Sequence, residues 1–206
     1  MGPNRRSHTA ALLLACLLAG SSAAQAETAA PTNASAANLS AIRIDNFARV
    51  DANYYRGAQP TGHDYEDLAA LGVRTVIDLT SDDSDPAEPA AAKRAGLVYY
   101  QIRMTTHDAP SPAKIEQFLR IVNDPSSQPV YVHCVGGRHR TGVMTAIYRM
   151  TDDGWSADQA FQEMKRYKYG PDFLHSEFKA FVYSYRPELA GATPVKAAVS
   201  EQSGNR

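Results

Sequence analysis

Short apolar runs alternate with longer amphipathic stretches through the middle of the chain. The runs are rich in β-branched and aromatic residues and end at turn signals, so each predicts a buried strand. Strands are expected at residues 53–56, 73–79 and 97–104, and at 130–132, where the run continues into Cys134. Their brevity and full hydrophobicity are typical of strands covered on both faces.

Helical stretches separate these strands and follow the last one. Thr61 with Asp64, Ser111 with Pro112, and Ser156 with Gln159 are start signals for helices. Helices are expected from Thr61 to Gly72, before Gly96, from Ser111 to about Asn123, and at residues 141–150, 156–167 and 172–185. Strands alternating with helices predict an α/β fold with a mainly parallel central sheet flanked by helices. In such sheets ligands bind beyond the carboxyl ends of the strands, where Cys134 stands.

The N-terminal residues 1–26 have the order of a secretory signal peptide. Arg5 and Arg6 precede an apolar run at residues 10–19, and the small-residue site Ala24-Gln25-Ala26 follows. The run is too short to span a bilayer, so cleavage after Ala26 and export to the periplasm or the medium are expected. A twin-arginine signal is an alternative, although His8 stands where an apolar residue is usual; a lipid anchor at Cys16 is disfavoured because the run continues past it.

The mature chain is expected to contain one domain. Residues 27–40 and 188–206 are small and polar and predict a linker and a tail, which leaves residues 41–187 for the domain. The whole chain carries a formal charge of -1, and removal of the signal leaves about -3. Neither value indicates nucleic-acid or membrane binding. A monomer without a membrane span is expected.

Cysteine usage narrows the chemistry. Cys16 and Cys134 are the two cysteines of the chain, so the exported form retains one thiol and no internal disulfide. A lone thiol of this kind is either an inert core residue or a reactive group. The glycines and the arginine around Cys134 favour the reactive interpretation.

Residues 133–142 read His-Cys-Val-Gly-Gly-Arg-His-Arg-Thr-Gly. A buried strand ends at Cys134, two glycines permit a tight curl, and a helix is expected to begin near Arg140. The N–H groups of such a curl form an anion site that also favours thiolate over thiol. The predicted phosphate-binding residues are therefore Val135, Gly136, Gly137, Arg138, His139 and Arg140, with the planar fork of Arg140 suited to two phosphoryl oxygens.

Covalent phosphoryl transfer follows from this arrangement. Cys134 is the expected nucleophile, Thr141 a hydrogen-bond donor to the departing sulfur, and His133 a residue that orients the loop or tunes the thiol. Three other interpretations are possible: an inert core thiol, a phosphate-binding module without turnover, and a metal site of His133, Cys134 and His139. The metal site lacks a fourth ligand, so no metal and no cofactor are predicted.

The pattern Cys-x5-Arg, with His133 before it and Thr141-Gly142 after it, resembles the signature loop of the protein tyrosine phosphatase superfamily. The atypical dual-specificity phosphatases of plants and fungi are more similar still, because their loop has a basic residue and then histidine before the arginine, as Arg138-His139 does here. Residues 55–60, 72–79 and 154–156 also resemble that family. The resemblance implies a cysteine phosphatase fold over about residues 50–185. Rhodanese-like sulfurtransferases share the bare Cys-x5-Arg pattern and remain an alternative.

The leaving oxygen needs a proton, usually from a carboxylic acid on a neighbouring loop. Asp108 follows the strand at 97–104 and stands 26 positions before Cys134. Its surroundings resemble the mobile acid loop of the family, which implies the general-acid role for Asp108. The alternative is that Asp108 only shapes a turn before Pro110. Substitute acids would be His107 or the cluster of Asp82, Asp83 and Asp85, which is otherwise a solvated loop.

Two substrate classes are expected. Arg138 and His139 add positive charge beside Arg140, and Lys165, Arg166 and Lys168 would extend it unless they form a solvated helix face. A basic rim suits multiply phosphorylated substrates, and the plant and fungal relatives hydrolyse inositol pyrophosphates. A phosphotyrosine protein is the other candidate.

Overall fold

A computed structural model describes residues 39, 41–81 and 83–187 of the chain. The predicted signal peptide at residues 1–26, most of the predicted linker and the predicted tail lie outside the described residues. Among the helices that are described, none combines the length and the hydrophobicity needed to cross a membrane.

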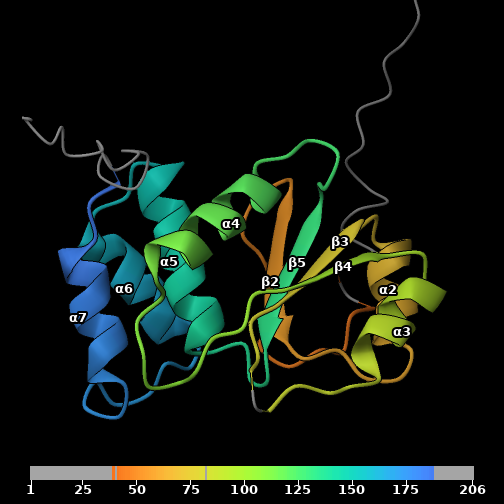
Figure 1. The fold of residues 1–206 in the computed structure, drawn as a ribbon, viewed down its shortest axis with the longest axis horizontal. Coiled ribbons are helices and arrows are strands. Elements are labelled where there is room, and N and C mark those ends of the chain that lie inside the picture. Colours follow the sequence, from red (N-terminus) through yellow and green to blue (C-terminus); the bar gives the residue numbers. More distant parts are fainter. Residues whose placement is uncertain (1–38, 40, 82, 188–206) are drawn as a thin grey trace, which may run out of the picture. The chain divides into compact units, whose positions relative to one another are not determined.

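A five-stranded, mostly parallel sheet forms the centre of the domain, with the spatial order β1-β2-β5-β3-β4 (Figure 1). The strands are β1 (Ala48–Arg49), β2 (Tyr54–Ala58), β3 (Thr75–Asp78), β4 (Val98–Gln101) and β5 (Val130–Cys134). Strand β5 is paired in parallel on both sides, with β2 and β3, and all five of its residues are buried. The predicted α/β class and the four predicted strands are therefore confirmed.

The edge strand β1 is the one part of the sheet that the sequence pattern did not predict. It has two residues and pairs antiparallel with β2, placing Ala48 opposite Arg56 and Arg49 opposite Tyr55. A run of two residues has no measurable alternation, so its pairing is set by β2 alone.

Six described helices cover the two faces of the sheet: α2 (Asp64–Ala70), α3 (Glu88–Arg94), α4 (Pro112–Val122), α5 (Arg140–Thr151), α6 (Ala157–Arg166) and α7 (Ser176–Ser184). Figure 1 shows α2 and α3 on one face and α4 and α5 on the other, with α6 and α7 packed outside α5. Strands β2, β3 and β5 are thus buried between the two helical layers, whereas the edge strand β4 is partly exposed, with Val98 at 51% and Tyr100 at 38%.

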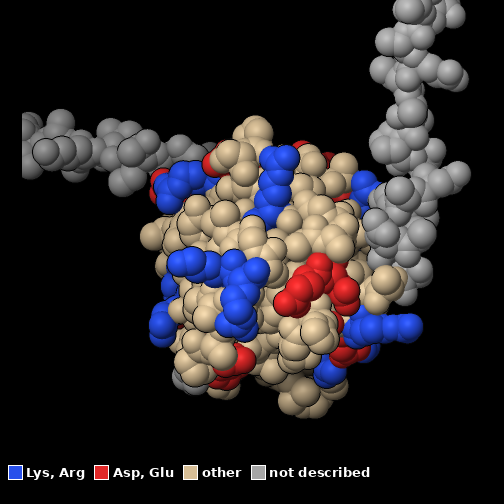
Figure 2. Space-filling view, turned by 90° about the vertical axis from the view of Figure 1, so that its right-hand side faces the viewer, with Lys and Arg blue, Asp and Glu red and all other residues tan. Residues whose placement is uncertain are grey.

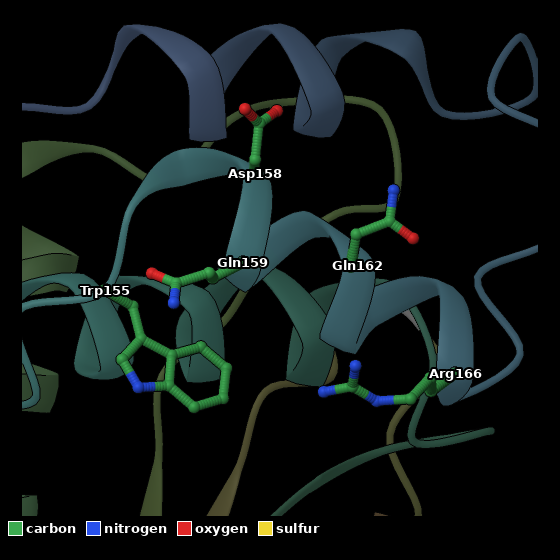
Figure 3. Close-up of a pocket in the computed structure, with 5 residues that line it drawn as sticks. All are labelled: Trp155, Asp158, Gln159, Gln162 and Arg166. Atoms are coloured by element: carbon green, nitrogen blue, oxygen red, sulfur yellow. The ribbon is translucent and has the colours of Figure 1, made fainter.

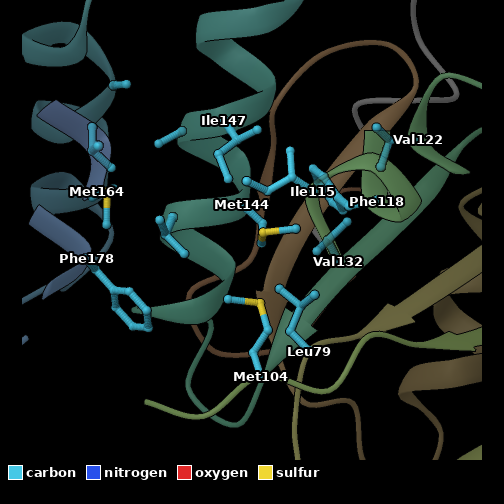
Figure 4. Close-up of a cluster of buried hydrophobic side chains, with 14 of the residues drawn as sticks. Leu79, Met104, Ile115, Phe118, Val122, Val132, Met144, Ile147, Met164 and Phe178 are labelled. Atoms are coloured by element: carbon cyan, nitrogen blue, oxygen red, sulfur yellow. The ribbon is translucent and has the colours of Figure 1, made fainter. Parts of the chain in front are cut away.

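Each face of the sheet has its own apolar core. Under α4–α7 the larger cluster includes Leu79, Phe118, Val132, Met144 and Phe178, all less than 2% exposed (Figure 4). The smaller cluster lies under α2 and α3. Because β5 contributes Val130 and Val132 to the larger cluster and Tyr131 to the smaller one, Cys134 ends a strand that is packed from both sides.

Helix starts agree with their predicted signals to different degrees. The capping box of α6 is present: the Ser156 N–H donates to Gln159 Oε1 at 2.9 Å and the Gln159 N–H to Ser156 Oγ at 3.3 Å. Helix α2 begins at Asp64 rather than at Thr61, because the Asp64 carboxylate accepts the Thr61 N–H at 2.8 Å within the preceding turn. Helix α7 begins at Ser176, four residues after the predicted start.

The late start of α7 has a structural reason. Asp172 lies in the segment between α6 and α7, where its carboxylate bonds Lys165 of α6 and Lys179 of α7, each at 2.7 Å. These two ion pairs fix Asp172 outside the helix that its sequence pattern predicted.

Figure 2 shows the side of the domain that carries α2 and α3. Lysine and arginine side chains and acidic side chains form small separate groups on this face, with uncharged surface between them. Charges of both signs therefore share this face, as the near-neutral formal charge of the chain suggests.

Candidate active site

Cys134 is the last residue of β5 and is 3% exposed. Residues 135–139 then form a tight loop, and α5 begins at Arg140. We refer to residues 134–140 as the phosphate loop. Its place at the carboxyl end of the central parallel strand is the one expected for a ligand site in this type of sheet.

Gly137 allows the phosphate loop to lie directly against β2. Its φ is +63°, and a Cβ atom added there would lie 2.3 Å from both the carbonyl carbon and the oxygen of Gly57, and 2.7 Å from the nitrogen of Ala58. These are backbone atoms of a central strand and cannot move aside. The loop therefore requires glycine at position 137 both for its conformation and for its close approach.

Two side chains from earlier in the sequence brace the loop from behind. Arg56 of β2 is fully buried and donates from Nη2 to the Gly137 oxygen at 2.7 Å, while its guanidinium lies 4.2 Å from the ring centroid of Tyr167. Asn46 donates from Nδ2 to the Gly137 oxygen at 2.8 Å and to the Tyr167 oxygen at 3.0 Å. Neither residue was predicted to contact the loop; for Arg56, the available signal was an arginine inside an apolar strand.

The Arg140 guanidinium is 3% exposed and is held at its tip. Its Nη1 donates to Asp83 Oδ1 at 2.8 Å and to the Met104 oxygen at 3.1 Å, and its Nη2 donates to Asp83 Oδ2 at 2.7 Å. Burial opposes the charge of Arg140, but Asp83 and the neighbouring Cys134 outweigh it and raise the pKa of the guanidinium.

These bonds leave one edge of the Arg140 guanidinium free. A guanidinium has five N–H groups in a plane, and Asp83 and Met104 take both on Nη1 and one on Nη2. The remaining Nη2 N–H lies on the same edge as Nε, which is buried and has no partner within the described residues. That edge presents two parallel donors, the arrangement that binds two oxygens of a phosphoryl group.

Asp83 was expected in a solvated acidic loop. Its side chain is 42% exposed, yet its carboxylate pairs with Arg140, and that pairing lowers the pKa of Asp83. Asp85 instead accepts the Ala87 N–H at 2.8 Å just before α3. Asp82 lies outside the described residues. Asp83 and Asp85 therefore have different partners, and Asp83 is the one of the two that pairs with Arg140 of the phosphate loop.

Thr141 and His133 flank the loop in the positions that the sequence predicted. Thr141, in the first turn of α5, is fully buried, and its Oγ1 has no hydrogen-bond partner among the described residues. His133 is also fully buried, with Nε2 lying 2.7 Å from Glu88 Oε1. The other carboxylate oxygen, Glu88 Oε2, accepts a hydrogen bond from Gln59 Nε2 at 3.3 Å.

Asp78, Glu88 and His133 place their donor atoms within 4.8 Å of one another, the one group of this kind among the described residues. The Asp78 carboxylate already accepts from the Thr80 N–H and hydroxyl, from the Tyr99 hydroxyl and from Gln101. Protein donors thus occupy the oxygens of Asp78, whereas Glu88 Oε1 and both ring nitrogens of His133 have no hydrogen-bond partner among the described residues.

Asp108 lies in the segment between β4 and α4, which we call the acid loop (residues 105–110). Its side chain is exposed and accepts from Thr105 Oγ1 at 2.9 Å, and its N–H donates back to the same oxygen at 3.1 Å. The acid loop begins directly after Met104, whose carbonyl bonds Arg140. The neighbouring His107 is exposed and contacts Thr106.

The cations near the phosphate loop are largely paired. Asp45 lies 3.8 Å from Arg138 and 2.5 Å from Lys168, and the hydrogen bond from Lys168 lowers the pKa of the Asp45 carboxyl. Lys165 bonds Asp172, and Arg166 lines an open hollow of about 380 Å³ beside Trp155 on the outer side of α6 (Figure 3). No phosphate-loop residue lines that hollow. Lys168 therefore shares the Asp45 carboxylate with Arg138. Lys165 and Arg166 have no contact with Arg138 or Asp45 among those described.

A tight loop of this kind, between a central strand that ends in cysteine and a helix that starts with arginine, is the arrangement expected of a cysteine-dependent phosphatase. Residues 31–182 match the family described as "DSP-PTPase phosphatase fused to NAD+ Kinase", and the chain belongs to this family of dual-specificity phosphatases. It is an enzyme of the phosphatase class.

Among curated proteins, dual specificity protein phosphatase TpbA of Pseudomonas aeruginosa is 33% identical over 177 residues, covering 84% of this chain and 77% of TpbA. Among solved structures, TpbA in complex with pTyr has a TM-score of 0.60 at 25% identity, covering 70% of this chain and 87% of that one. The core catalytic domain of the PP-IP phosphatase SIW14 of Saccharomyces cerevisiae has a TM-score of 0.62 at 25% identity, covering 71% and 89%. The expected resemblance is confirmed, and the rhodanese-like alternative is set aside.

Proposed function

We propose that this phosphatase uses Cys134 as its nucleophile and hydrolyses aryl phosphates of the phosphotyrosine type. The observation that carries the proposal is the free Nε/Nη2 edge of Arg140, which is positioned by Asp83 within the same loop as Cys134. Two phosphoryl oxygens bound there, with the third directed to loop N–H groups, would bring phosphorus toward the thiolate.

The reaction has two steps. The Cys134 thiolate attacks phosphorus, the bond to the leaving oxygen breaks, and Asp108 gives its proton to that oxygen. Water then attacks the phosphocysteine, Asp108 accepts a proton from the water, and the sulfur leaves as thiolate. The Thr141 hydroxyl, which has no hydrogen-bond partner among the described residues, is the proposed donor to that departing sulfur. His133, whose Nε2 lies 2.7 Å from Glu88 Oε1, is proposed to orient the loop.

The rim around the loop favours a protein-borne phosphotyrosine over an inositol polyphosphate. Asp45 neutralises part of the charge of Arg138 and Lys168, which an inositol polyphosphate would need. Apolar side chains are exposed nearby: Val135 on the loop itself, 47% exposed, and Phe173 and Leu174 in the segment before α7, 78% and 58% exposed. Apolar surface of this kind suits an aromatic ring and its flanking peptide.

Inositol pyrophosphates remain the second candidate, because SIW14 is a PP-IP phosphatase. The complex of TpbA with pTyr supports the phosphotyrosine proposal instead. A panel of phosphotyrosine peptides, inositol pyrophosphates and phosphoinositides, compared by kcat/KM with EDTA present, tests the choice. A higher kcat/KM for inositol pyrophosphates than for every peptide would overturn the phosphotyrosine proposal.

The same assay tests the nucleophile. Cys134→Ser is expected to abolish phosphate release while leaving the fold intact, because a serine hydroxyl is a poor nucleophile without a base. Undiminished release from this variant, or none from the unaltered protein, would contradict the assignment. The latter result would instead favour a phosphate-binding module without turnover.

We also propose that the protein is exported, on the basis of Arg5 and Arg6, the apolar run and the Ala24-Gln25-Ala26 site. N-terminal sequencing of the protein recovered outside the cytoplasm is expected to begin at Glu27. A mature chain that retains residues 1–26 would contradict the proposal.

A further inference from the structure

Two histidines from distant parts of the chain lie ring against ring beside the phosphate loop. His139 directly precedes α5 and His175 directly precedes α7, and their ring centroids are 3.7 Å apart with the planes tilted by 39°. The contact joins the phosphate loop to the segment between α6 and α7.

His139 is fixed on its own side of this contact. Its Nε2 lies 2.9 Å from the carbonyl oxygen of Tyr169, so Nε2 carries a proton and donates it. The Tyr169 ring packs edge-on against His139 at 5.4 Å, and the Tyr169 hydroxyl donates to the carbonyl oxygen of His175. Tyr169 thereby holds both histidines, one through its backbone and the other through its side chain.

His175 reaches from there to the acid loop. Its Nδ1 lies 3.1 Å from the carbonyl oxygen of Thr106, and the ring is 17% exposed. Because a carbonyl only accepts, Nδ1 carries the proton in this bond. Glu177 Oε1 lies 3.5 Å from the same Nδ1.

The bond from His175 is the single hydrogen bond that ties residues 105–110 to another part of the described chain. The other bonds of the acid loop are internal, with Thr105 Oγ1 accepting from the His107 and Asp108 N–H groups at 3.3 and 3.1 Å. The location of Asp108 therefore follows the location of this small turn, and the turn follows His175.

We propose that His175 is a positioning residue that holds the acid loop against the phosphate loop and so sets Asp108 at the leaving oxygen. The inference rests on the general-acid role proposed above for Asp108. His175 itself touches no reacting atom; it acts through the Thr106 carbonyl on one side and the His139 ring on the other.

A matched pair of substitutions separates the hydrogen bond from the volume of the side chain. Asparagine at position 175 places an amide N–H the same number of bonds from Cα as Nδ1, while leucine has nearly the same shape and no donor. The readout is kcat/KM for two aryl phosphates. Phenyl phosphate needs a proton on its leaving oxygen, whereas an activated fluorinated umbelliferyl phosphate does not.

His175→Leu is expected to lower kcat/KM about tenfold to a hundredfold for phenyl phosphate, since a misplacement of about 1 Å costs up to about 10²-fold. For the activated ester, kcat/KM is expected to change less than about twofold, because its leaving group does not need a proton from the acid. His175→Asn is expected to recover most of the loss. Equal losses on both esters, or no recovery with asparagine, would overturn the proposal. His175→Gln, which moves the donor by one bond, replaces leucine if that variant does not fold.

Asp108→Asn in the same series distinguishes this inference from the acid assignment beneath it. If Asp108→Asn lowers kcat/KM equally for both esters, Asp108 is not the general acid, and the inference about His175 is then also wrong. If Asp108→Asn is selective for phenyl phosphate and His175→Leu is not, the positioning role alone fails. If both are selective, the double variant is expected to lose no more than Asp108→Asn, because both changes remove the same proton transfer.

Discussion

Both carboxylate oxygens of Asp83 accept hydrogen bonds from Arg140, one from Nη1 and one from Nη2. Nε of Arg140 has no hydrogen-bond partner among the described residues. An acidic residue beside a phosphate site would be expected to repel the substrate. Here the carboxylate binds an edge that the phosphoryl group does not need, so it orients the arginine instead of competing with the substrate.

Removal of this carboxylate should weaken phosphate binding. In Asp83→Ala the inhibition constant of inorganic phosphate or orthovanadate is expected to rise about fivefold, since a partly exposed ion pair contributes up to about 1 kcal/mol. Asp85→Asn is the control, because Asp85 bonds the Ala87 N–H rather than Arg140. Tighter inhibition in Asp83→Ala would show that Asp83 competes with phosphate.

The two adjacent glycines of the phosphate loop should differ sharply in tolerance. Gly137→Ala places a methyl group into the backbone of Gly57 at a φ of +63°, so kcat/KM is expected to fall by about a hundredfold as the loop is displaced. Gly136→Ala meets only the flexible side chain of Arg138, at 3.3 Å, and is expected to keep activity within about fivefold. Similar activity in both variants would contradict the close packing of the loop on β2.

Asp45 offers a test of the substrate argument. Asp45→Asn frees Arg138 and Lys168, so KM for an inositol polyphosphate is expected to fall about threefold to fivefold at low salt, and the effect should fade at high ionic strength. KM for a singly phosphorylated peptide should change little. Asp172→Asn, which frees Lys165 and Lys179 instead, is the matched control. An equal gain in that control would mean that the location of the cation is unimportant.

Acid should destabilise the domain through His139. Burial is the largest cause that lowers the pKa of His139, followed by the nearby charges of His175, Arg138 and Arg140, against the opposing bond to Tyr169. The unfolded chain therefore takes up this proton first, and the free energy of unfolding falls as the pH drops below about 6.5, levelling off below the folded-state pKa. Urea unfolding at pH 7.5 and 5.5 measures the change. In His139→Gln the fall should be smaller; the same fall in both proteins would contradict the prediction.

The strand that ends at Cys134 and the helix that begins at Arg140 could be predicted because their signals are local. Apolar periodicity, the glycines and the arginine all lie within about 12 residues. The residues that complete the site could not be found this way. Asp83 is separated from Arg140 by 57 positions, and Arg56 and Asn46 are separated from Gly137 by 81 and 91. Such pairings depend on the order of strands in the sheet, which hydrophobic periodicity does not encode.

The predicted solvated loop that contains Asp83 and Asp85 illustrates the same limit. Its composition correctly predicted a loop before α3, but composition treats Asp83 and Asp85 alike, and the structure does not. The reason is that β3 and β5 are neighbours, which brings the residues after β3 to the end of β5 where Arg140 lies.

The bond from Asn46 to the Gly137 oxygen has a practical consequence for anyone who shortens the protein. Asn46 precedes the first strand, in a stretch that looks dispensable by its position. A version trimmed to begin at Val50 would keep β2 and β5, the two strands next to the phosphate loop. It would lose Asn46 and the pairing between Ala48 and Arg56. A fragment that keeps this bond must therefore begin at or before Asn46, and one that begins at Val50 is expected to have a less ordered phosphate loop.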